Sequence, residues 1–110
     1  MDQAQQATIA EAMNRLWAQY LPQIEERVAT LESAADASAE GALTAAQCEQ
    51  AVAAAHKLAG VLGTFGLPEG TELAREVETL YAGGPAALSD AGDRAKQVAA
   101  RLRAMLATRG

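Results

Sequence analysis

The chain contains a single histidine, His56, within the stretch "AAAHKLAGVLGTFG" at residues 53–66. A catalytic triad or a zinc site needs partner residues, and a single histidine with no cysteine pair near it offers none. An imidazole can act alone as a nucleophile, because its neutral form keeps one nitrogen lone pair free to attack. A phosphoryl group is a suitable electrophile, and the metal and carboxylates that assist its transfer can all lie on a partner protein.

The composition argues against several other classes of protein. The chain has 110 residues and a net charge of −5, which does not favour a general nucleic-acid binder. Its first residues, "MDQAQQATIAEAMNRLW", lack the basic region and apolar run of a signal peptide, and no apolar segment reaches the roughly 20 residues that span a bilayer. One cysteine, Cys48, allows no internal disulfide. We therefore expect a cytoplasmic protein without a metal site.

Alanine is the commonest residue and β-branched residues are few, which favours an all-α fold. Apolar residues at spacings of three and four predict helices from about Thr8 to Tyr20, from Pro22 to about Ala35, from Ala45 to Thr64 or Phe65, from Pro68 to the "GGP" at 83–85, and from Ser89 to about Thr108. We expect one domain over residues 1–110 with its core at about 8–108. Its predicted fold is an antiparallel four-helix bundle with an additional short N-terminal helix. A single unbroken helix kinked at Pro22 is the alternative for the first two segments.

Local signals set the ends of the predicted helices. Thr44 and Gln47 have the spacing of a capping box, so the central helix should begin just after Thr44. Gly66 suits the position that follows a helix end, and Pro68 suits the first turn of the next helix. Ser89 is the expected N-cap of the last helix.

A helical wheel, drawn at about 100° per residue, separates His56 from the predicted core. The opposite face carries the expected core residues Ala51, Ala54, Leu58, Val61, Leu62 and Phe65. The side of the histidine carries Glu49, Val52, Ala53, Gly60 and Gly63, which we call the predicted docking surface. Each glycine within a helix lowers stability by about 0.5–1 kcal/mol relative to alanine. Two glycines on this side therefore suggest an open surface where another macromolecule approaches the histidine. The simpler alternative is that an alanine-rich helix carries small residues on every side.

The stretch "AHKLAGVLGTFGLPEGTELAREVETL", residues 55–80, resembles the signature of histidine phosphotransfer (Hpt) domains of bacterial two-component phosphorelays. His56, Leu58, Gly60 and Gly66 match the spacing of that signature. The resemblance implies that His56 accepts a phosphoryl group through Nε2 from the aspartate of a receiver domain, and donates it to one. It implies a phosphorylated intermediate that is not an enzyme and holds no cofactor of its own, with Mg²⁺ on the receiver.

We expect a monomer whose partners are a receiver domain and a hybrid histidine kinase. The net charge and the lack of a long apolar segment argue against nucleic acid and membrane as partners. The sequence departs from the pattern at one point. Most members of the family carry a lysine three residues after the histidine, whereas this chain has Ala59 there and a lysine at Lys57. Lys57 is therefore a candidate to stabilise the charge of the phosphoryl group, and a solvated surface lysine is the alternative.

Two other hypotheses remain open on the sequence. The first is a helical adaptor that binds a receiver domain without being phosphorylated, which the position of Lys57 supports. The second is a dimerising bundle of the kind found in histidine kinases. In those bundles an acidic residue usually follows the histidine, and this chain has Lys57 at that position.

Overall fold

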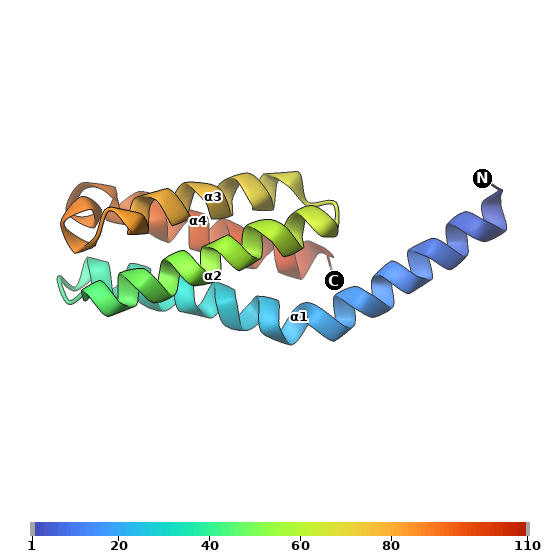
Figure 1. The fold of residues 1–110 in the computed structure, drawn as a ribbon, viewed down its shortest axis with the longest axis horizontal. Coiled ribbons are helices and arrows are strands. Elements are labelled where there is room, and N and C mark those ends of the chain that lie inside the picture. Colours follow the sequence, from blue (N-terminus) through green and yellow to red (C-terminus); the bar gives the residue numbers. More distant parts are fainter. Residues whose placement is uncertain (1, 110) are drawn as a thin grey trace.

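The structure, a computed structural model, describes residues 2–109. Over this range the chain forms four α-helices and one short 3₁₀ helix: α1 (Gln3–Ala39), α2 (Ala45–Thr64), α3 (Pro68–Ala82), η1 (Pro85–Ala87) and α4 (Leu88–Arg109). Consecutive α-helices run in opposite directions and pack side by side along one axis (Figure 1). The predicted all-α, antiparallel four-helix bundle is confirmed.

The additional short N-terminal helix is not seen among the described residues, so that part of the prediction is wrong. Residues 3–39 form one helix, and Pro22 lies inside it. A proline removes one backbone hydrogen bond and crowds the preceding turn, which bends a helix without having to end it. Figure 1 shows α1 changing direction where it reaches the bundle. The alternative of an unbroken helix through Pro22 is the correct one.

The N-terminal part of α1 extends beyond the other helices (Figure 1). For this reason the molecule measures 54 Å along its longest axis and about 20 Å across. Trp17 is the first buried residue of α1, and Ile9, Leu16 and Tyr20 are between 41% and 50% exposed. The apolar residues of the helix predicted from Thr8 to Tyr20 are therefore only partly covered, and α1 joins the core from Trp17 onward.

The local signals at both ends of α2 are confirmed. The backbone N–H of Gln47 donates to Thr44 Oγ1 at 3.1 Å, and the backbone N–H of Thr44 donates to Gln47 Oε1 at 2.8 Å. After α2 ends, Gly66 has a φ of +73°, a conformation that glycine adopts without strain. Pro68 is the first residue of α3. The short connection between α2 and α3 places these two helices side by side and antiparallel.

The predicted N-cap of the last helix is wrong. The helix η1 leads directly into α4 at Leu88, which is buried, so Ser89 already lies within the helix. The Ser89 hydroxyl donates to the carbonyl of Ala86 at 2.9 Å. Leu88 anchors this end in the core, and α4 begins two residues earlier than it would with Ser89 as its N-cap.

Three ion pairs connect α4 to neighbouring helices at the surface. Arg94 pairs with Glu76 and Arg101 with Glu69 on α3, and Arg103 pairs with Glu32 on α1. Hydrogen bonds from the arginines hold the pKa of Glu69 and of Glu76 below the ordinary range. All six side chains are partly or largely exposed, so these pairs contribute little to stability individually. In these pairs the guanidinium groups of three arginines are already bound to carboxylates.

Candidate functional site

His56 lies in the middle of α2, on the side facing solvent. Its side chain is 76% exposed, while Ala55 and Leu58 beside it are fully buried. The predicted core face is buried at Ala51, Ala54, Leu58, Leu62 and Phe65, and half-buried at Val61. The orientation that the helical wheel gives His56 is therefore confirmed.

A carboxylate from α3 holds one side of the imidazole ring. His56 Nδ1 lies 3.1 Å from Oε2 of Glu78, whose side chain is 29% exposed. An ionised carboxylate only accepts hydrogen bonds, so Nδ1 must carry the hydrogen and donate it. In a neutral ring with this tautomer, Nε2 bears the free lone pair. The contact therefore leaves Nε2 as the nucleophilic atom of the ring.

Sequence reasoning missed Glu78, although a signal for it exists. His56 and Glu78 lie at equal distances along the chain from Leu67, in the turn between α2 and α3. Two antiparallel helices joined by a short turn place such residues next to each other. Gly63 and Thr71 form a second such pair, and a Cβ added to Gly63 would lie 3.2 Å from Thr71 Oγ1. Matching residues at equal distances from the predicted turn would therefore have predicted the contact between Glu78 and His56.

An open hollow of about 680 Å³ lies between α2 and α3 beside the histidine, and we call it the α2–α3 hollow. From α2 it is lined by Val52, His56, Ala59 and Gly60, and from α3 by Arg75, Glu78, Thr79 and Ala82. Two members of the predicted docking surface, Val52 and Gly60, thus share one hollow with His56. Arg75 is a basic residue in this hollow that the sequence analysis did not single out as a site residue.

Lys57 lies on the other side of α2. It lines a separate hollow between α1 and α2, together with Ala53 and the basic residue Arg27 of α1. Glu49 lines a third hollow, near Cys48 and Tyr81. The predicted site residues are therefore divided between the two flanks of α2, and Lys57 does not share the hollow of His56.

The two glycines of the predicted docking surface have different surroundings. At Gly63, an added Cβ would press on the hydroxyl of Thr71, which donates to the carbonyl of Ala59 at 2.9 Å. Gly63 therefore has a packing role, since it lets α2 and α3 approach closely. At Gly60, an added Cβ would meet nothing within 4 Å. The packing within this chain does not require a glycine at position 60.

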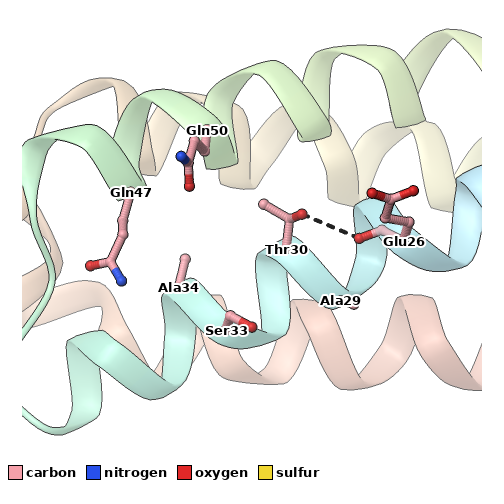
Figure 2. A pocket seen from close by; sticks show the side chains of 7 residues that line it. All are labelled: Glu26, Ala29, Thr30, Ser33, Ala34, Gln47 and Gln50. Atoms are coloured by element: carbon pink, nitrogen blue, oxygen red, sulfur yellow. Dashed lines mark hydrogen bonds between the residues drawn. The ribbon is translucent and has the colours of Figure 1, made fainter.

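A second feature of the α1–α2 side is a polar groove of about 300 Å³, which Figure 2 shows from close by. Its lining includes the amides of Gln47 and Gln50 and the hydroxyls of Thr30 and Ser33. The Thr30 hydroxyl donates to the carbonyl of Glu26 at 3.2 Å. Amides and hydroxyls can form hydrogen bonds, but none of them is a nucleophile comparable to an imidazole, so the groove is not a candidate reaction site.

The remaining reactive side chain, Cys48, is buried, and burial raises the pKa of its thiol. A thiol of this kind is a poor nucleophile. Among residues 2–109, no group of three or more His, Cys, Asp or Glu side chains is placed to hold a metal ion. None of the helices described is both long and apolar enough to cross a membrane.

Comparison with known protein families gives a match to the model of the Hpt domain over residues 15–108. The chain belongs to the Hpt domain family. The matched range begins close to Trp17, where α1 joins the core, and ends near the end of α4. No match was found among the curated proteins or among the solved structures.

Membership in the Hpt family gives the chain a histidine phosphotransfer role in phosphorelays. Hpt domains are phosphorylated intermediates in these relays and not catalytic enzymes, and their partners include receiver domains. The resemblance noted at residues 55–80 is confirmed, and it lies within the matched range.

Proposed function

We propose that His56 is the residue of this Hpt domain that accepts and donates the phosphoryl group. The observation that carries the proposal is the hydrogen bond from Nδ1 to Glu78, which leaves Nε2 free on an exposed ring. His56 is also the only histidine of the 110 residues. A histidine phosphotransfer role therefore has one candidate residue in this sequence.

The chemical step follows from this geometry. The lone pair of His56 Nε2 attacks the phosphorus of an aspartyl phosphate on the partner and forms an N–P bond. The P–O bond to the aspartate breaks, and its electron pair leaves with the carboxylate. The ring gains positive charge during this step, while its Nδ1 proton stays in the hydrogen bond to Glu78. The negative carboxylate stabilises that charge, and donation to a second receiver reverses the same steps.

The partner is a receiver domain that docks over the exposed side of α2. Glu49, Val52, Ala53, Gly60 and Gly63 form the docking surface in this proposal, and the receiver supplies Mg²⁺. Four of these five residues are small or apolar, so a flat partner surface can approach the imidazole closely. We further propose that the domain acts as a monomer in the cytoplasm and that a hybrid histidine kinase can carry the receiver.

The test is phosphoryl transfer from radiolabelled, phosphorylated receiver domains to the wild-type chain and to His56→Gln. We expect an acid-labile, alkali-stable label on the wild type and none on the variant. Equal labelling of the two chains would contradict the proposal. Binding of a receiver without any labelling of the wild type would instead favour the adaptor hypothesis, in which the domain is never phosphorylated.

Replacing Gly60 with glutamine is expected to separate stability from transfer. The substitution raises the free energy of unfolding by about 0.5 kcal/mol, because glycine is the weaker helix former and an added Cβ meets nothing within 4 Å. We expect transfer from a phosphorylated receiver to slow by about tenfold, because the added side chain keeps the receiver from docking closely. A factor of ten corresponds to roughly 1.4 kcal/mol of free energy.

The matched control for this prediction is Ala100→Gln, which adds similar bulk to an exposed position of α4. Thermal unfolding and the initial rate of labelling are measured on both variants. A Gly60→Gln chain that is labelled as fast as the control would show that nothing docks closely at this position.

A further inference from the structure

We propose that Arg75 binds the phosphoryl group carried by His56 and neutralises its charge. This inference rests on the proposed function of His56, since it concerns the phosphorylated state of that residue. It assigns the stabilising charge to α3, on the opposite flank of α2 from Lys57.

The placement of Arg75 supports the assignment. Arg75 precedes Glu78 by three residues on α3, so the two side chains are neighbours on one face of that helix. Glu78 in turn contacts His56. Arg75 and Ala59 lie at equal distances along the chain from Leu67, which sets Arg75 about one helical turn from the histidine. Arg75 and His56 accordingly line the same α2–α3 hollow.

The guanidinium of Arg75 is also free to bind an anion. Arg94, Arg101 and Arg103 each pair with a glutamate of a neighbouring helix. In the part of the chain that the structure describes, no acidic group lies within 4.0 Å of the Arg75 guanidinium. An unpaired guanidinium beside the histidine offers the forked donors that bind phosphate oxygens in pairs.

Gly60 leaves room for this contact. It lines the same hollow as Arg75 and His56, and the space that its side chain would occupy is open. The long arginine side chain can extend across the glycine toward a phosphoryl group on the ring. The absence of a side chain at position 60 thus serves the bound phosphoryl group as well as the docking partner.

Arg75 also offsets the negative charge that Glu78 places beside the phosphoryl group. The carboxylate that holds Nδ1 is negative, and so is the phosphoryl group on the same ring. Like charges at this separation repel each other, even where water screens them. A cation one turn from Glu78, within the same hollow, offsets both charges. Lys57 lines the separate hollow between α1 and α2, so it is neither part of the α2–α3 hollow nor paired with Glu78.

The experiment measures the ionisation of the phosphoryl group in the full chain without a receiver. Phosphoramidate, a small donor that releases ammonia when the imidazole attacks it, phosphorylates the wild type, Arg75→Gln, Arg75→Lys and the matched control Lys57→Gln. The ³¹P resonance of each phosphorylated chain is then followed against pH. Because no receiver is present, an effect of Arg75 on docking alone would leave the titration unchanged.

We expect Arg75→Gln to raise the pKa of the phosphoryl group by about half a unit, as loss of a nearby cation at a solvated site does. Arg75→Lys keeps a cation at this position, so the pKa of its phosphoryl group stays close to the wild-type value. Lys57→Gln leaves the titration as in the wild type. A wild-type titration curve for Arg75→Gln, or a larger shift for Lys57→Gln, would overturn the assignment and leave the role of His56 intact. Failure of the wild type to form phosphohistidine would overturn the proposed function itself, and this inference with it.

Discussion

Replacing Glu78 with glutamine is expected to slow phosphoryl transfer to this Hpt domain about tenfold without unfolding it. The amide oxygen of glutamine can still accept the hydrogen bond from His56 Nδ1, so the ring keeps its orientation. The negative charge that stabilises the developing charge on the ring is lost. A hydrogen bond to a charged group is worth roughly 1–1.5 kcal/mol more than a neutral one, and 1.36 kcal/mol corresponds to a factor of ten in rate.

The matched control for the Glu78 prediction is Glu72→Gln, an exposed glutamate on the same helix. The initial rate of labelling from a phosphorylated receiver is compared for both variants and the wild type, with thermal unfolding as a check on the fold. Equal rates for the two variants would show that the contact between Glu78 and His56 has no part in transfer.

The second large effect is expected for Trp17→Ala, which should lower the free energy of unfolding by about 3–5 kcal/mol. Trp17 is 2% exposed, and its ring meets that of Phe65 edge to face at 5.2 Å between centroids. Arg109 Cζ lies 5.0 Å from the centre of the same indole ring. In a core built largely of alanine, valine and leucine, this aromatic pair fills the end of the bundle where α1, α2 and α4 meet.

Tyr20→Ala provides the control for the Trp17 prediction. Tyr20 also approaches Phe65, at 6.2 Å, but it is 41% exposed and should cost about 1 kcal/mol. Chemical denaturation of the two variants measures the difference. Equal losses for both, or a loss below 1 kcal/mol for Trp17→Ala, would contradict the packing of α1 against the end of the bundle.

Local signals account for the parts of the fold that the sequence predicts well. The capping box of Thr44 and Gln47 and the pair Gly66 and Pro68 act within a few residues, so they can be recognised without knowledge of tertiary contacts. The continuity of α1 through Pro22 cannot be recognised in this way. One lost backbone hydrogen bond favours a break, while burial of Ile24, Val28 and Leu31 on the same helix stabilises the segment that follows, and only the packed structure decides between them.

The candidate site likewise has one part that local sequence predicts and one part that depends on tertiary packing. The exposure of His56 follows from the periodicity of its own helix, and the structure confirms it. Glu78 and Arg75 lie on the next helix, and their approach to His56 depends on how α2 and α3 align about the turn at residues 65–67. The position of Lys57 illustrates the same limit, because a residue adjacent in sequence faces the opposite hollow.

The most direct measurement of the proposed chemistry is the identification of the phosphorylated atom. The ¹⁵N-labelled chain is phosphorylated by a receiver, and nitrogen–phosphorus couplings are recorded by nuclear magnetic resonance. We predict coupling of the phosphorus to Nε2 of His56, with a proton retained on Nδ1 in contact with Glu78. A phosphoryl group on Nδ1, or on any residue other than His56, would contradict the account.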